Sequence, residues 1–179
     1  MYPSRTQKPL ERFFAGLAEH TFHGRLGVAD TKLVDYIASL LVRFADCDAH
    51  LVRNISGKRV DEVAEMMVEA QVRVGDARRQ VYRQIGDFTL FWTGVFPEAL
   101  TRLQHPDRKD HLIDYSDQGK RSYFMASRIR SQESAEECEV LERLAHEFDL
   151  CVHGLGEVRR EWERRDADGT GPGGKIWVN

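Results

Sequence analysis

A chain of 179 residues with 41% apolar content can form one hydrophobic core and does not require a second domain. Its formal net charge of −3 provides no field of a single sign, so we expect no nucleic-acid partner. The cysteines Cys47, Cys138 and Cys151 are odd in number and lack the paired spacing of zinc ligands, which favours reduced thiols and a cytoplasmic protein. The opening stretch MYPSRTQKPLERFF has no apolar signal core, and we expect no membrane partner.

Apolar residues recur at helical spacing along almost the whole chain. No β-branched run alternates with polar residues for long enough to predict a strand. The expected fold is therefore all-α, a single-domain bundle of about six or seven helices with a buried central helix. We expect residues 1–165 to form this bundle and residues 166–179 to form a Gly/Pro-rich arm with an apolar tip.

The first predicted helix opens at Pro9, where the missing donor of proline costs nothing. It is expected to end at Gly24 or Gly27. Asp30 or Thr31 then caps a second helix with a clear apolar stripe.

A third helix is predicted to be capped by Ser56, to carry Val60 and to end at Gly75. The fourth begins near Asp76. Its segment 81–96 is apolar around the whole circumference, which indicates a helix surrounded by other helices. This segment is the predicted centre of the bundle.

Pro97 is expected to stop the fourth helix and to begin a short one with Glu98 in its first turn. The stretch HPDRKD that follows is typical of a turn. A sixth helix is predicted over about 110–130.

A long seventh helix is predicted over about 134–165. Its apolar residues alternate three and four apart, as in a coiled-coil seam: Leu141, Leu144, Phe148, Cys151, Leu155, Val158 and Trp162. We interpret it as a long helix that lies antiparallel against the bundle. Gly154 and Gly156 lower helix stability, so a kink or break is expected there.

Small residues interrupt two of the predicted helices. Gly86 and Gly94 lie in the fourth, and Gly119, Ser122 and Ala126 lie on one face of the sixth. Glycine inside a helix is costly unless another body approaches closely. We therefore expect the fourth and sixth helices to cross here, with a bound ligand as the alternative.

Asp87 is a carboxylate in the helix that is predicted to be buried, and a buried charge needs a partner. Lys120 and Arg121 are the candidate cations, and Tyr123 is a candidate donor. One interpretation is an ion pair that sets helix register, and another is an Asp87 at an exposed helix edge. The functional interpretation is a ligand-binding polar pocket formed by Asp87, Asp114, Asp117, Arg121 and Tyr123.

The stretches GDFTLFWTGVFPE and DYSDQGKRSYFMAS together resemble a pattern of an uncharacterised family of bacterial all-helical proteins. The resemblance covers about the middle third of the chain. It implies no activity.

None of the seven histidines has a glutamate three residues before it, so the paired motif of di-iron bundles is absent. Three pairs have a spacing that would supply half of a metal site: His20 with His23, Asp46 with His50, and Glu142 with His146. Such pairs arise by chance on helices rich in charge. We expect solvated or capping histidines and no bound metal.

The chain contains no G-x-S-x-G elbow, Walker A motif, dinucleotide fingerprint or HExxH motif. Cys47 with His50 is the nearest approach to a nucleophile with a base. A GKR triplet at 57–59 would suit phosphate at a helix N-terminus, or an ordinary solvated first turn. We predict no catalytic residue and no cofactor.

The leading functional hypothesis is a protein-interaction or self-association module, with a protein partner or a homo-oligomer. Its predicted contact residues are Trp162, Ile176, Trp177 and Val178. The apolar tip either folds back on its own bundle or reaches a neighbouring chain. The alternative is a small-ligand-binding or metal-dependent enzyme with a polar pocket around Asp87 and Arg121.

Overall fold

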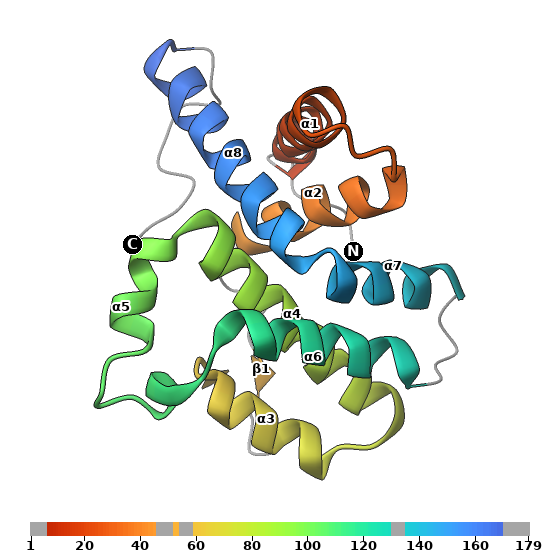
Figure 1. Ribbon diagram of the computed structural model, residues 1–179, viewed down its shortest axis with the longest axis vertical. Helices are drawn as coiled ribbons and strands as arrows, with labels where there is room; N and C mark the ends of the chain where they lie inside the picture. Colours follow the sequence, from red (N-terminus) through yellow and green to blue (C-terminus); the bar gives the residue numbers. More distant parts are fainter. Residues whose placement is uncertain (1–6, 46–51, 54–58, 130–134, 170–179) are drawn as a thin grey trace.

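The computed structural model describes residues 7–45, 52–53, 59–129 and 135–169 (Figure 1). The expected all-α class is confirmed. The eight α-helices of these residues are α1 (Gln7–Ala18), α2 (Thr31–Ala45), α3 (Val63–Val72), α4 (Gly75–Val95), α5 (Leu100–Leu103), α6 (Tyr115–Arg128), α7 (Ala135–His146) and α8 (Phe148–Ala167). The shorter elements are the π-helix η1 (Glu19–Arg25), the 3-10 helices η2 (Pro97–Ala99) and η3 (Lys109–Leu112), and the two-residue antiparallel strands β1 (Val52–Arg53) and β2 (Arg59–Val60). In these ranges, no helix combines the length and the apolar character that crossing a membrane requires.

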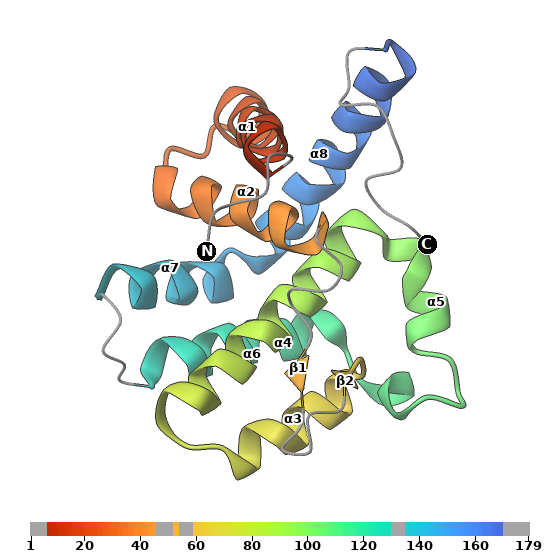
Figure 2. The same ribbon diagram turned by 180° about the vertical axis from the view of Figure 1, so that it is seen from behind.

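Helix α4 is the centre of the bundle, and the predicted buried central helix is confirmed. Figures 1 and 2 show it running diagonally through the molecule, with α1, α2 and α8 on one side and α3 and α6 on the other. All residues from Ile85 to Phe91 are buried, and Trp92 is half-buried. A helix that is apolar on every side has this position because each side needs a neighbour.

The start of α2 is as the sequence predicts. Oδ1 of Asp30 accepts a 3.2 Å hydrogen bond from the backbone N–H of Leu33, which satisfies one of the free amides of the first turn. Before it, the chain turns at Gly27, which has a φ of 69°.

The start of the third helix differs from the prediction. Val60 lies in β2, and α3 begins only at Val63. The predicted cap, Ser56, lies outside the described residues. The first free amides of α3 are satisfied instead by the distant carboxylate of Asp110. Gly75 has a φ of 56° and opens α4, whereas α3 has already ended at Val72.

The single long helix predicted over 134–165 is wrong. The chain bends at Glu147, which separates α7 from α8 (Figure 1). Phe148 is fully buried and its ring lies against Gly119 of α6. Gly154 and Gly156 do not break α8: the ring of Phe22 packs on Gly154, and Gly156 lies beside Gly94 of α4. The bend thus lets α7 follow α6 while α8 crosses α4.

The glycine pattern correctly predicted close contact between the fourth and sixth helices. A Cβ added to Gly86 would lie 2.7 Å from the ring of Tyr123, and one added to Gly119 would lie 2.5 Å from the hydroxyl of Thr89. Gly94 serves another contact, because its neighbour is Leu155 of α8. Small residues therefore allow α4 to approach both α6 and α8.

Candidate functional site

Two features stand out, and the first is a buried polar group that we name the Asp87 cluster: Asp87, Tyr36, Arg43 and Tyr123. Asp87 is 5% exposed. Its Oδ1 accepts hydrogen bonds from the hydroxyls of Tyr36 at 2.6 Å and Tyr123 at 2.8 Å, and its Oδ2 accepts one from Arg43 at 2.9 Å. The carboxylate from α4 is thus bound to α2 by two side chains and to α6 by one.

Burial raises the pKa of both Tyr36 and Tyr123, and the negative charge of Asp87 raises the pKa of both further. Burial opposes the charge on Arg43, but Asp87 together with Tyr36 and Tyr123 outweighs burial, and the pKa of Arg43 is raised. These donors therefore keep their protons far above neutral pH. Proton transfer near pH 7 needs groups that titrate there, so the arrangement is that of a static ion pair.

The cation at Asp87 is Arg43, and neither candidate from the sequence takes this place. Lys120 pairs with Asp149 of α8 at 2.8 Å. Arg121 is exposed, because it is two residues from the buried Tyr123 and so points to nearly the opposite side of α6. The predicted pocket with Asp87 facing Arg121 is not formed.

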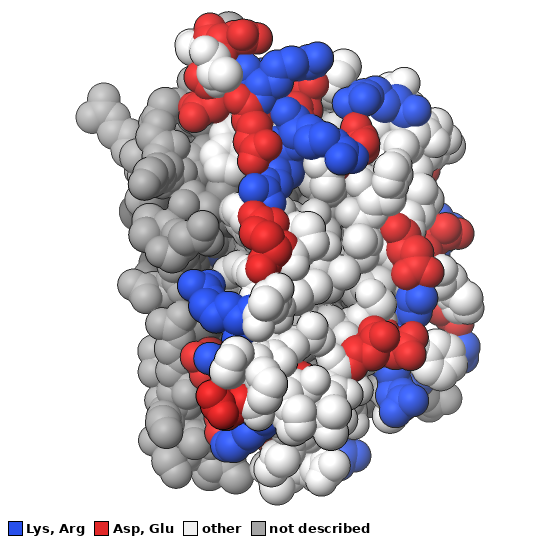
Figure 3. All heavy atoms as spheres, turned by 60° about the vertical axis from the view of Figure 1, so that its left-hand side comes forward, with Lys and Arg blue, Asp and Glu red and all other residues white. Residues whose placement is uncertain are grey.

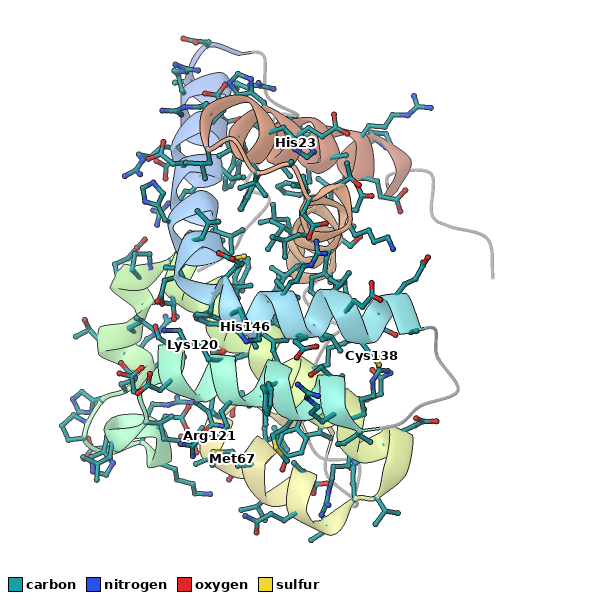
Figure 4. All side chains as sticks on the ribbon, turned by 45° about the vertical axis from the view of Figure 1, so that its right-hand side comes forward. His23, Met67, Lys120, Arg121, Cys138 and His146 are labelled. Atoms are coloured by element: carbon teal, nitrogen blue, oxygen red, sulfur yellow. The ribbon has the colours of Figure 1, made fainter. Side chains whose placement is uncertain are left out.

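The second feature is an open groove between α3 and α6, which we name the α3–α6 groove. Its volume is about 420 Å³. It is lined by Ala64, Met67, Val68, Gln71, Leu112, Ile113, Asp114, Asp117, Gln118 and Arg121. Figure 4 shows Met67 and Arg121 facing the same space between the two helices. Three predicted site residues, Asp114, Asp117 and Arg121, therefore lie together here, while Asp87 and Tyr123 lie in the core.

The rim of the groove is apolar and open to solvent. Val68 is 59% exposed and Leu112 is 85% exposed. The charges are separated by sign, with Asp114 and Asp117 beside the first turn of α6 and Arg121 one turn further on. Within the described part of the chain, these three charged residues form no ion pair. The groove thus combines an apolar wall with unpaired charges at its edge.

Asp110 holds the two walls of the groove together. Its side chain is 1% exposed and accepts from the N–H groups of Val63 at 2.9 Å and Ala64 at 2.8 Å, at the N-terminus of α3. It also accepts a 2.6 Å bond from the hydroxyl of Tyr115, the first residue of α6. Burial and this bond raise the pKa of Tyr115. The two helices therefore start from one shared carboxylate.

No group of three or more metal-ligating side chains occurs among the described residues. Nδ1 of His146 lies 2.8 Å from the backbone oxygen of Glu142, and Nδ1 of His23 contacts the backbone oxygen of Val28. Both histidines thus engage the backbone. Asp46, Cys47 and His50 lie outside the described residues.

Burial raises the pKa of Cys151 to about 12, so this thiol is a packing residue.

Of the four predicted partner-binding residues, the structure describes only Trp162. Trp162 is half-buried and packs against the core. Ile176, Trp177 and Val178 lie outside the described residues, and their contact role stays a prediction.

Surface charges do not form a patch of one sign on the face drawn in Figure 3. Acidic and basic side chains are interleaved there, most densely along α8 at the top. The charged side chains of α8 include ion pairs of Arg159 with Glu98 and of Arg165 with Glu161. Nothing on this face resembles the basic stripe of a nucleic-acid interface.

Tyr123 was predicted from the sequence as a donor to Asp87 and is one, whereas the donors Tyr36 and Arg43 and the buried Asp110 were not predicted. Tyr36 and Arg43 are seven residues apart and so lie on one side of α2, which is the signal that was available. Asp110 and Leu112 lie in a polar connection with no periodicity. Nothing local indicates that one is buried or that the other borders a groove.

Comparisons with known proteins found no family model, no curated protein and no solved structure that matches this chain. The Asp87 cluster and the α3–α6 groove are therefore the features from which a function can be argued.

Proposed function

We propose that this protein is an interaction module that binds another protein through the α3–α6 groove. The observation that carries the proposal is the exposure of Val68 and Leu112 on the two sides of one open groove. Single exposed apolar residues are ordinary on protein surfaces. Two that border the same groove, with Met67 and Ile113 half-buried between them, form a surface that gains from being covered.

A partner that presents an amphipathic helix fits this groove. Helix α3 has 10 residues and is therefore about 15 Å long. A docked helix of that length makes about three turns and presents three apolar anchors at i, i+3 or i+4, and i+7. Covering Val68 and Leu112 contributes about 1.5–3 kcal/mol for each before the costs of association.

The charges at the groove set the polarity of the partner. Asp114 and Asp117 favour a basic residue at one end of the docked helix, and Arg121 favours an acidic residue one turn away. Charges at an interface edge contribute more to orientation than to affinity. The apolar anchors therefore supply the affinity, and the charges supply the direction.

The alternative of an enzyme with a pocket around Asp87 and Arg121 has no support in this geometry. Both carboxylate oxygens of Asp87 already accept hydrogen bonds, and Arg121 lies on the exposed side of α6. The Asp87 cluster supports a structural role, which is to join α2, α4 and α6.

The test is selection of peptides on the purified protein from a display library of 14-residue amphipathic helices with varied apolar and charged positions. Peptides selected on the wild type, labelled with fluorescein, are measured by anisotropy. We expect Leu112→Asp and Val68→Asp to weaken binding at least tenfold, because each places a charge on the apolar wall.

The matched control is Val74→Asp, which changes a valine that is 79% exposed and lies outside the groove. This variant should leave the affinity unchanged. If no peptide is enriched, or if the selected peptides bind Leu112→Asp as well as they bind the wild type, the proposed function is wrong.

A further inference from the structure

We infer that the partner is a second copy of this chain, and that two α3–α6 grooves close face to face about a two-fold axis. This inference rests on the proposed function. Asp117 and Arg121 lie one turn apart at the edge of one groove and have opposite charge. A surface with this pattern is complementary to a second copy of itself that is rotated by a two-fold axis.

The direction of the helices gives the geometry of the pair. Asp110 joins the start of α3 to the start of α6, so both helices run the same way along the groove. A two-fold axis that lies across the groove reverses α6 in the second copy. When the axis passes between Asp117 and Arg121, Asp117 faces Arg121 of the partner subunit. The two-fold symmetry also places Arg121 against Asp117 of the partner subunit, so the dimer contains two equivalent ion pairs.

The apolar residues of the groove become an interior in this arrangement. Two copies of α3 and two of α6 form a layer-on-layer packing of four helices. Met67, Val68 and Leu112 lie on the facing walls. The open groove of the single chain is thus the half-core of a four-helix contact.

Charges elsewhere on α6 argue for a partner at this side. Lys120 pairs with Asp149 at 2.8 Å, and Arg128 pairs with Glu142 at 2.6 Å. Figure 4 shows Lys120 on the side of α6 toward α7 and α8. In the ranges that the structure describes, Asp117 and Arg121 at the groove form no ion pair, in contrast to Lys120 and Arg128.

The size of the surface sets the expected strength. Helix α6 has 14 residues and is about 21 Å long, and two adjacent helices are about 20 Å wide, so the face has an outline of about 400 Å². Stable dimers bury about 800 Å² per partner. We therefore expect a dimer with a dissociation constant in the micromolar range, which dissociates on dilution.

The experiment is sedimentation equilibrium of the full chain from about 5 μM to about 1 mM, a range chosen for a weak dimer. The wild type should approach twice the monomer mass. Asp117→Arg places two cations opposite each other, and Arg121→Asp places two anions opposite each other, so each variant should dimerise at least tenfold more weakly. The double variant D117R/R121D should recover the dimer.

A mixture of the two single variants provides the sharpest readout. Asp117→Arg and Arg121→Asp should form a mixed dimer with each other while neither pairs with itself, because only the mixed pair has opposite charges in contact. Arg102→Asp, at an exposed arginine of α5, is the control and should dimerise as the wild type does. Circular dichroism verifies that each variant keeps its fold.

A wild type that stays monomeric at about 1 mM overturns this inference, in a range well above the expected dissociation constant. The inference is also overturned if Asp117→Arg and Arg121→Asp each dimerise as strongly as the wild type. In either case the selected peptides still report on the groove. Peptide binding without a dimer means that the proposed function holds with another protein as partner, whereas loss of both means that the groove is not a binding surface.

Discussion

The hydroxyl of Tyr123 on α6 donates a 2.8 Å hydrogen bond to Oδ1 of Asp87 on α4, beside the point where the two helices touch. The ring of Tyr123 lies on Gly86, the residue before Asp87. One tyrosine therefore makes both a close packing contact and a polar contact between the same two helices. The position of α6 on α4 is set by shape and by hydrogen bonding at once, and the α6 wall of the groove depends on it.

Removing one hydroxyl from the Asp87 cluster should destabilise the fold. Tyr123→Phe leaves the buried carboxylate with one donor fewer, and we expect a loss of about 1–3 kcal/mol in the free energy of unfolding. Urea unfolding followed by circular dichroism measures it. Tyr82→Phe on the same helix as Asp87 is the control. Tyr82 is half-buried and makes no hydrogen bond in the described ranges, so its variant should stay within about 0.5 kcal/mol of the wild type. Equal losses in the two variants would contradict the role of the cluster.

Two glycines should respond in opposite directions to the same substitution. Gly119→Ala places a Cβ 2.5 Å from the ring of Phe148, and overpacking of this kind costs about 1–3 kcal/mol. Gly16→Ala on α1 meets no atom within 4 Å, and should stabilise the fold by about 0.5–1 kcal/mol through helix propensity. Thermal unfolding of both variants checks the pair. A higher midpoint for Gly119→Ala would show that α6, α4 and α8 are not in close contact there.

Stability should fall at alkaline pH. Burial raises the pKa of Cys151 to about 12 and raises the pKa of Tyr36 and Tyr123, so these groups stay protonated in the folded chain. In the unfolded chain the thiol ionises near about 8.5 and the phenols near about 10. The unfolded state therefore binds fewer protons at high pH, and stability declines as pH rises from about 9 through the folded-state pKa values.

Urea unfolding at pH 8, 10 and 11 measures this decline. Cys151→Ala removes one of the contributing groups and should make the decline shallower, whatever its effect on stability at pH 8. Tyrosine absorbance at 295 nm gives an independent readout, because Tyr36 and Tyr123 should ionise only when the chain unfolds. A free energy of unfolding that is constant from pH 8 to 11 would contradict the burial of these groups.

Asp110→Ala should loosen α3 and the α3–α6 groove together. It removes the acceptor of two backbone amides and of the Tyr115 hydroxyl, and we expect a loss of about 2–4 kcal/mol. Hydrogen exchange should show faster exchange at the amides of Val63 and Ala64. Peptides selected on the groove should bind this variant more weakly.

Two further variants make the Asp110 experiment specific. Asp110→Asn keeps an acceptor oxygen and should lose about half as much stability. Asp107→Ala, at an exposed carboxylate in the same connection, should change stability by less than about 0.5 kcal/mol. Unchanged exchange at the start of α3 in Asp110→Ala would show that α3 does not depend on this carboxylate.

Much of the fold could be predicted from local patterns. Apolar residues on every side of 85–91 predicted the buried position of α4, and Pro97 marked the start of η2. Asp30 was a predicted cap and is one. These features depend on residues within a few positions of each other, so the sequence carries their signal directly.

The bend at Glu147 shows where local pattern was insufficient. The apolar spacing of three and four continues through Leu144, Phe148 and Cys151, which is compatible with one straight helix. The bend is required by two distant contacts, of Phe148 with Gly119 and of Gly154 with Phe22. Neither contact leaves a trace in the periodicity of the segment.

For the candidate sites too, some features could be predicted from the sequence and others depended on the tertiary structure. The sequence alone placed Asp87 in a helix predicted to be buried, where a carboxylate needs a partner, and left an exposed helix edge as the alternative. Only the tertiary structure decided that its cation is Arg43, 44 residues away, and that Asp110 caps Val63, 47 residues away. It also decided that Asp114, Asp117 and Arg121 border a groove with α3. Helix formation depends on neighbours in the chain, whereas the choice among several possible partners for a buried charge depends on which helices pack together.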